Sequence, residues 1–218
     1  MNKIRIISDL AVNLAIASFT VMAVYNYFSG GPDALGSVDT QTFRYFTTDS
    51  NLLMAVIALI YAGFNILCLI RPGTAEPKWL HVMKFIGTTA VSVTFVTVVI
   101  FLGPTAAMKS GARGYFRLFA GNVFFLHFLC PILAIVSFAL LERGPRLSVI
   151  ETLWALIPTV VYSLVYYIMV VKAAHPWPDF YGFTFGGRLW AIPFSMIGMY
   201  SLTYGLATLL RVTGPAIK

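Results

Sequence analysis

Long apolar runs divide this chain of 218 residues, and they restrict its fold more than any other feature. Hydrophobic residues make up 59% of the sequence and charged residues only 11%, whereas soluble domains carry about a quarter charged residues. Because a bilayer-spanning helix needs about 20 mainly apolar residues, we predict six transmembrane helices. They are Ile7–Phe28, Ser50–Ile70, Val82–Leu102, Phe119–Leu141, Thr152–Val171 and Leu189–Leu210. We therefore expect an all-α polytopic fold, with residues 1–218 forming a single integral membrane helical domain.

The 15 Lys and Arg residues fall mainly between the apolar runs, and their distribution predicts an orientation. With six spans, one side of the membrane receives nine: Lys3, Arg5, Arg71, Lys78, Lys84, Arg143, Arg146, Arg211 and Lys218. The other side receives six: Arg44, Lys109, Arg113, Arg117, Lys172 and Arg188. Because cytoplasmic links carry the excess of basic residues, both termini are predicted to be cytoplasmic. We expect a multipass protein of a bacterial inner membrane.

No disulfide, cofactor or nucleic-acid partner is indicated. Cys68 and Cys130 both lie inside apolar runs, which argues against a disulfide framework. The sequence contains no HExxH motif, no Cys/His or carboxylate cluster and no glycine-rich phosphate loop. Its basic residues do not gather beside exposed aromatic residues, as a nucleic-acid surface requires. We therefore expect no metal and no cofactor.

A polar stretch stands directly before the apolar segment 52–69. It holds five consecutive small polar residues, Thr47, Thr48, Asp49, Ser50 and Asn51. This pattern is typical of a helix start, where side-chain oxygens accept from free backbone N–H groups. The positive end of the helix dipole would also stabilise an oxyanion. A threonine hydroxyl at this position is either a cap, which is the commoner case, or a nucleophile.

His127 lies about eight residues into the fourth predicted span, within FFLHFLCP. An ionisable residue at membrane depth is costly and is a functional hypothesis by default, although a neutral imidazole that bonds a neighbouring helix explains it equally well. Pro131 lacks the N–H that would bond the His127 carbonyl, so we expect a bend. An inward dip of the segment around Thr47 would bring hydroxyl and imidazole together as a base-activated nucleophile.

Four further residues are candidates for supporting roles. Tyr162 and Tyr166 in the fifth predicted span could donate to a substrate oxygen, and Asp179 in HPWPDFYGFTFG could line a rim or lid. Asn122, like Asp49, could orient His127. Interfacial aromatic residues, helix caps and interhelical hydrogen bonds explain the same residues without a substrate.

Three short motifs together resemble the androgen-induced gene family of multipass membrane threonine hydrolases, including its bacterial relatives. They are YFTTDSN at 45–51, HFLCP at 127–131 and WPDFYGF at 177–183. The resemblance implies that Thr47 is a nucleophile and His127 its base in the hydrolysis of fatty acid esters of hydroxy fatty acids. It also implies a membrane lipid or fatty-acyl ester as substrate. The oxyanion would bind backbone N–H groups around Asp49–Asn51.

Two other classes of function remain open. A small-solute transporter could use His127 as a proton relay, but transporters often show repeats and paired broken helices, and none is visible here. A non-enzymatic lipid-binding membrane protein could use His127 as a structural residue. Within the enzyme hypothesis, Thr48 is an alternative nucleophile because it directly follows Thr47.

Overall fold

The computed structural model describes residues 3–29, 39–142 and 144–214, and within these ranges the chain is helical without strands. The α-helices are α1 (Lys3–Phe28), α2 (Phe46–Ile70), α3 (Lys78–Thr97), α4 (Gly103–Arg117), α5 (Asn122–Phe124), α6 (Cys130–Val136), α7 (Val149–Trp154), α8 (Ile157–Tyr167) and α9 (Ile192–Thr213). Five-residue π-helical segments, here called π-turns, are η2 (Val98–Leu102), η3 (Phe125–Leu129), η4 (Ser137–Leu141) and η5 (Ile168–Lys172). Two 3-10 segments, η1 (Asp39–Arg44) and η6 (Leu189–Ala191), precede α2 and α9.

Five helical stretches among the described residues are long and apolar enough to cross a membrane. They are Lys3–Phe28, Phe46–Ile70, Lys78–Arg117, Asn122–Leu141 and Val149–Lys172. The all-α fold is therefore confirmed, and the long apolar helices agree with an integral membrane protein. The 22-residue helix α9 is not among these five stretches, so the sixth span stays a prediction.

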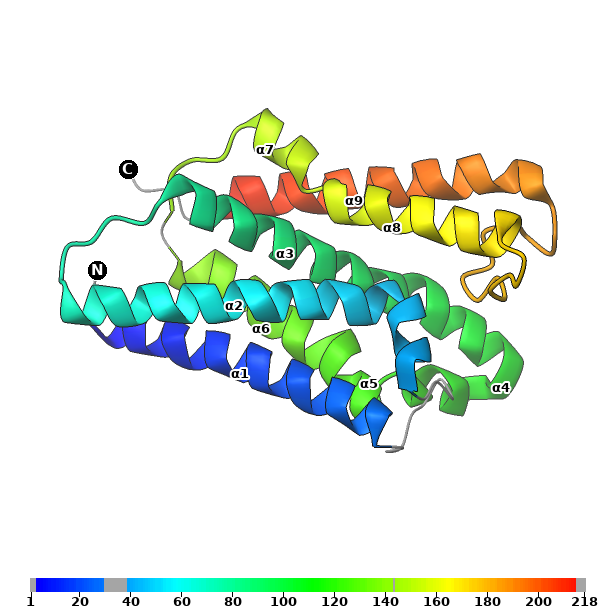
Figure 1. Cartoon of the computed structure of the whole chain (residues 1–218), viewed down its shortest axis with the longest axis horizontal. Coiled ribbons are helices and arrows are strands. Elements are labelled where there is room, and N and C mark those ends of the chain that lie inside the picture. Colours follow the sequence, from blue (N-terminus) through cyan, green and yellow to red (C-terminus); the bar gives the residue numbers. More distant parts are fainter. Residues whose placement is uncertain (1–2, 30–38, 143, 215–218) are drawn as a thin grey trace.

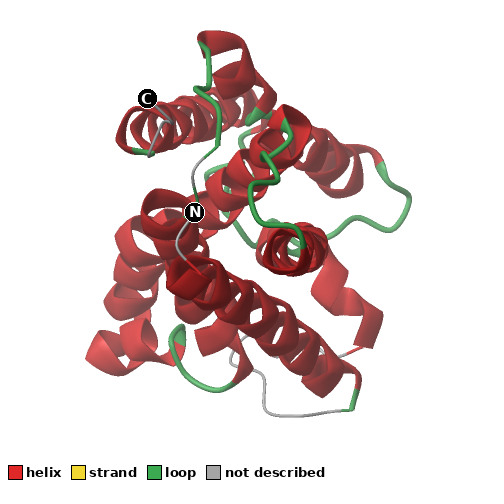
Figure 2. Ribbon diagram, turned by 90° about the vertical axis from the view of Figure 1, so that its left-hand side faces the viewer, coloured by secondary structure: helices red, strands yellow, loops and turns green. Residues whose placement is uncertain are grey.

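Successive long helices run in alternating directions through the bundle (Figure 1). The start of α1 and the end of α9 lie together at one end, here called the terminal end. The start of α2, helix α4 and the link 173–188 lie at the opposite end, here called the distal end. Figure 2 looks along the bundle from the terminal end and shows the helices end-on.

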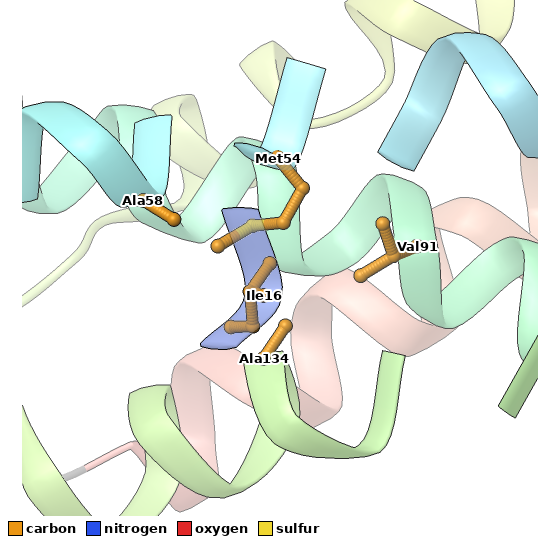
Figure 3. Close-up of a cluster of buried hydrophobic side chains, with 5 residues drawn as sticks. All are labelled: Ile16, Met54, Ala58, Val91 and Ala134. Carbon is orange, nitrogen blue, oxygen red and sulfur yellow. The ribbon is translucent and has the colours of Figure 1, made fainter. Parts of the chain in front are cut away.

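A small apolar cluster fixes four helices against one another. Ile16 of α1, Met54 and Ala58 of α2, Val91 of α3 and Ala134 of α6 are each fully buried. Met54 and Ala134 point toward Ile16 from opposite sides (Figure 3). Small side chains at Ala58 and Ala134 let the helices approach closely, as is usual in membrane bundles, where dispersion contacts replace the hydrophobic effect.

The segment after Gly103-Pro104 is a helix and not the predicted link. Pro104 directly follows the π-turn η2, in which the Gly103 N–H bonds the Val98 carbonyl, and this turn carries the helix past the proline, so α3, η2 and α4 join. The chain turns back instead at Ser110 and Gly111, and Gly111 has φ of 65°, a conformation that favours glycine. The returning half packs closely, since a Cβ on Gly103 would lie 2.5 Å from the Tyr115 ring.

One basic residue assigned to the second link lies inside a helix. Lys84 belongs to α3, is 0% exposed and places Nζ 2.9 Å from Glu142 Oε1. Nine residues minus Lys84 leaves eight against six, so the predicted orientation keeps its sign. Arg143 and Lys218, which are also counted, lie outside the described residues.

Reporter fusions test the orientation of the terminal end. Because the basic residues still favour that side, green fluorescent protein fused after Lys218 should fluoresce and alkaline phosphatase at the same place should be inactive. Insertion of the same reporters into the link 173–188 is the control and should give the reverse pattern. An active phosphatase after Lys218 would reverse the orientation.

Candidate functional site

The polar stretch at the start of α2 lies inside the helix and does not cap it. The N-cap residue is Tyr45, which makes no side-chain cap bond, and α2 begins at Phe46. Two of the hydroxyls are bound elsewhere: Thr48 Oγ1 lies 3.0 Å from Thr42 Oγ1, and Ser50 Oγ lies 3.0 Å from Thr94 Oγ1. The prediction that these side chains cap the helix is therefore wrong.

The backbone N–H groups of this first turn are mostly occupied. Thr48 and Asp49 donate to the Tyr45 carbonyl at 3.0 and 3.3 Å, so Asp49 cannot offer the predicted oxyanion donor. The Phe46 N–H donates to the Tyr181 hydroxyl at 3.1 Å. The Thr47 N–H has no acceptor among the residues that the structure describes. Thr47 is thus the residue of this turn whose N–H can still bind an anion.

A cavity of about 340 Å³ adjoins the start of α2. It lies between the end of α3 with η2, helices α8 and α9, and the link that carries Tyr181. Its lining includes Thr47, Thr97, Tyr162, Tyr181, Phe183 and Met199, and most of its walls are apolar. Thr48 does not line it and is 2% exposed, whereas Thr47 is 9% exposed. The cavity therefore distinguishes between the two adjacent threonines.

His127 is buried beside this region within the π-turn η3. The Cys130 N–H bonds the Phe125 carbonyl across five residues, immediately before Pro131, so the expected irregularity takes the form of a wide turn. The imidazole is 1% exposed and does not line the cavity. Its Nδ1 lies 2.7 Å from the Leu118 carbonyl. Because a carbonyl only accepts, Nδ1 carries the hydrogen and Nε2 the basic lone pair.

Asn51 connects the start of α2 to the turn that contains His127. Its side-chain NH₂ donates to the Thr47 carbonyl at 2.7 Å and to the Leu126 carbonyl at 2.9 Å. Its Oδ1 is buried and has no donor among the described residues. Within the same residues, the Thr47 hydroxyl and the His127 imidazole make no hydrogen bond to each other. The structure thus brings their helical turns together without joining the two groups directly.

Asn122 and Asp49 have other surroundings than those expected of orienting residues. Asn122 Oδ1 accepts from Asn26 Nδ2 at 2.8 Å, which ties α5 to α1. Asp49 lines a second cavity of about 340 Å³ between α2 and α8, together with Phe43 and Trp177. Neither side chain hydrogen-bonds to His127 in the described part of the chain. His127 is oriented by the Leu118 carbonyl instead.

Asp179 and Tyr166 do not line the first cavity but organise the link beside it. Asp179 accepts hydrogen bonds from the Tyr166 hydroxyl at 2.7 Å, from the Phe183 N–H at 2.9 Å and from Thr184, through its N–H at 2.8 Å and its hydroxyl at 2.5 Å. Burial acts to raise the pKa of the Asp179 carboxyl, but these hydrogen bonds outweigh it and hold that pKa below its usual range.

Tyr181 is the functional candidate that the sequence analysis missed. It lines the first cavity with Tyr162 and accepts from the first N–H of α2. Burial raises the pKa of the Tyr181 phenol, so the hydroxyl stays protonated. Only its place inside WPDFYGF could have indicated Tyr181 from the sequence. A residue in a link does not belong to a helical pattern that would show which way its side chain faces.

Comparison of the chain with protein families, with curated proteins and with solved structures finds no match. The resemblance stated above therefore rests on three short motifs. The motif at 45–51 contributes Thr47 to the first cavity, and that at 177–183 contributes Tyr181 and Phe183. The motif at 127–131 lies next to Leu126, whose carbonyl Asn51 binds. The motif at 45–51 therefore contacts the motif at 177–183 directly and reaches the turn that holds the motif at 127–131 through Asn51.

Acid titration tests the role of Asp179. A carboxyl whose folded pKa is depressed stabilises the fold above its unfolded pKa, near 4, and this contribution is lost as pH falls through the folded pKa. Asp179→Asn should therefore be less stable at neutral pH and should lose less stability on acidification. Thermal unfolding in detergent, followed by tryptophan fluorescence, measures both effects.

Tyr166→Phe is the matched control because it removes one of the four donors to Asp179. It should destabilise by about 1.5–3 kcal/mol, the usual contribution of one hydrogen bond to a charged group, and keep the acid transition. Identical acid profiles for the wild type and Asp179→Asn would show that this carboxylate does not support the fold.

Proposed function

We propose that this chain is an intramembrane lipid-ester hydrolase with Thr47 as its nucleophile. One observation carries the proposal. The Thr47 residue lines the cavity, and its hydroxyl has no hydrogen-bond partner among the described residues, whereas the hydroxyls of Thr48 and Ser50 are both bound. A buried hydroxyl left unpaired beside an apolar cavity is available for chemistry.

The cavity walls suit an acyl chain. Beyond Thr47 they consist largely of apolar side chains from η2 and α9, including Ile100, Phe101, Met199 and Leu202. Because these walls are as apolar as the bilayer interior, a fatty-acyl group would enter from lipid without giving up polar contacts, and packing against the walls would hold it. The ester carbonyl would then lie at the Thr47 end. An acyl substrate can reach such a site directly from the bilayer.

His127 is the proposed base. Its Nδ1–H is held by the Leu118 carbonyl, which leaves the Nε2 lone pair to accept a proton. The Asn51 bridge keeps its turn against that of Thr47, and catalytic hydrogen bonds often tighten only when substrate is bound. Proton transfer from Thr47 to Nε2, directly or through one water, would accompany attack of the threonine oxygen on the ester carbonyl.

The remaining steps balance without a further co-reactant except water. Collapse of the tetrahedral intermediate breaks the ester C–O bond, and the imidazolium gives its proton to the leaving alcohol. Water then loses a proton to Nε2 and attacks the acyl-threonine. The second collapse returns the proton to Thr47 and releases the carboxylic acid.

Two donors are placed to stabilise the oxyanion. The Thr47 N–H is without an acceptor among the described residues, and Tyr181 also lines the cavity. Since the Tyr181 hydroxyl accepts from the Phe46 N–H, its own hydrogen is left for another acceptor such as a bound oxyanion. This pair replaces the N–H groups of Asp49–Asn51 as the proposed oxyanion hole.

Adjacent threonines supply a matched test of the nucleophile. Thr47→Ala should abolish ester hydrolysis and labelling by a fluorophosphonate probe, because it removes the attacking oxygen. Thr48→Ala should keep most activity, since its hydroxyl is bound to Thr42 outside the cavity. His127→Ala should lose nearly as much activity as Thr47→Ala, because residues that act as a unit lose function non-additively.

Hydrolysis of fluorogenic acyl esters by purified protein, together with probe labelling and mass spectrometry of the labelled peptide, measures these outcomes. Loss of activity in Thr48→Ala alone would move the nucleophile by one residue. Unchanged hydrolysis in all three variants, or no labelling of the wild type, would reject the enzyme and favour the transporter or lipid-binding alternatives.

The proposed oxyanion hole has its own test in Tyr181→Phe. Loss of one oxyanion donor commonly lowers kcat by roughly 10²–10³-fold, with a small effect on KM. Tyr162→Phe is the control from the same cavity, because the Tyr162 hydroxyl donates to the Arg44 carbonyl at 2.5 Å and has no hydrogen to spare. Equal kcat values for the two variants would remove Tyr181 from the mechanism.

A further inference from the structure

A second buried polar cluster lies toward the terminal end of the bundle, remote from the cavity. It brings together Asp9 and Asn13 of α1, Asn65 of α2, Lys84 of α3, Ser137 of η4 and Glu142 after it, each at most 2% exposed. Asn65 and Thr47 are both on α2, about 27 Å apart at ~1.5 Å per residue. The cluster therefore stands independently of the proposed hydrolase.

Lys84 has no hydrogen left to give within this cluster. Its ammonium group lies 2.9 Å from Glu142 Oε1 and 3.2 Å from Ser137 Oγ, and it also donates to Asn13 Oδ1. These three contacts use its three N–H bonds. Any further donor that the carboxylates need must come from another group.

Ser137 lies between the two carboxyl groups. Its Oγ is 2.7 Å from Asp9 Oδ1 and 2.6 Å from Glu142 Oε1, both normal lengths for O–H···O hydrogen bonds. A serine hydroxyl has one hydrogen, and that hydrogen cannot form both hydrogen bonds at once. Lys84 donates to the Ser137 oxygen and so supplies no hydrogen to either serine–carboxyl contact. One of the two short contacts therefore requires a hydrogen carried by a carboxyl group.

We propose that Asp9 and Glu142 form a proton-binding site in which one proton is held along the Asp9–Ser137–Glu142 chain. Because both carboxyl groups contact the same serine oxygen, the proton belongs to the chain and not to one residue.

Unpartnered atoms independently support this site. Glu142 Oε2 and Asn65 Oδ1 are buried without a donor among the described residues, while Asn65 Nδ2 donates to Asp9 Oδ2 at 2.8 Å. An ionised carboxylate with one bare oxygen in this environment is costly, whereas an unpaired oxygen of a shared acid costs much less.

The charged groups around the pair do not supply the missing hydrogen. Arg5 donates to the carbonyls of Leu140, Leu141 and Glu142 at 2.7, 2.5 and 3.0 Å. The Tyr61 ring lies 4.9 Å from Lys84 Nζ, and its hydroxyl has no partner in the described residues. Glu76 pairs with His81 at 3.0 Å, and the His81 ring stacks on Phe138.

The proton links the packing of α1 to the segment 137–142. With the proton bound, hydrogen bonds join α1 to η4 through Ser137. Without the proton, the negative charges of Asp9 and Glu142 both face the Ser137 oxygen, whose single hydrogen can bond only one of them. The two carboxylates then repel each other across Ser137. Loss of the proton should therefore loosen α1 from this part of the bundle.

Infrared spectroscopy of the full chain in lipid nanodiscs tests the proposal directly. At neutral pH the wild type should show the C=O stretch of a protonated carboxylic acid, shifted in D₂O. Asp49→Asn is the control and should keep this band. The band should disappear in Asp9→Asn, in Glu142→Gln or in both. Lys84→Met should add a second protonated carboxyl, because removal of the Lys84 ammonium takes away the counter-charge within this cluster.

Carboxyl-¹³C labelling of aspartate and glutamate assigns the band in the wild type even if a variant does not fold. Absence of the band from the wild type, or its persistence in both Asp9→Asn and Glu142→Gln, would overturn the proposal. If the band is missing and Na⁺ raises the unfolding temperature relative to choline, the cluster binds a monovalent cation in place of the proton.

Discussion

Hydrocarbon offers no hydrogen-bond partners, so polar groups along the bundle must find theirs within the protein. This constraint explains why the buried polar side chains gather where helices meet. Ser50 and Thr94 join α2 to α3 at 3.0 Å, and Thr159 and Thr203 join α8 to α9 at 3.2 Å. Pairing is incomplete in both regions that carry the proposals, the Thr47 turn and the Asp9–Ser137–Glu142 chain.

The two regions differ in what the incomplete pairing leaves. At the distal end, Thr47 has a hydroxyl and an N–H without partners among the described residues, and both belong to a residue on an apolar cavity. Toward the terminal end, the shortage is of hydrogens between acceptors, among residues that do not line that cavity. The unpaired groups of Thr47 suit a neutral substrate with a polar centre, whereas the missing hydrogen between the carboxyl groups suits a bound proton.

Hydropathy predicted the helical fold because each apolar run is long and continuous. The boundaries agree with the structure to a few residues, except that the third helical stretch continues to Arg117. The helix at 103–117 was missed because Gly103-Pro104 resembles a turn, whereas the π-turn before it carries the helix past the proline. Lys84 was assigned to a link because its partner Glu142 is distant in sequence. The same distance hid the whole polar cluster, whose members are dispersed from Asp9 to Glu142. Periodicity describes local structure and cannot identify such pairs.

The candidate site was predicted only in part, for a related reason. The sequence identified the stretch around Thr47 and the residue His127, but their relation depends on Asn51 reaching two carbonyls far apart in the chain. The π-turn around His127 has a further consequence. Each such turn accommodates one residue more than an α-helix needs, and a residue in a helix corresponds to about 100° of rotation. Loss of a single residue from η3 would swing the imidazole to another face of the helix, so chain length in this segment is constrained as strictly as residue identity.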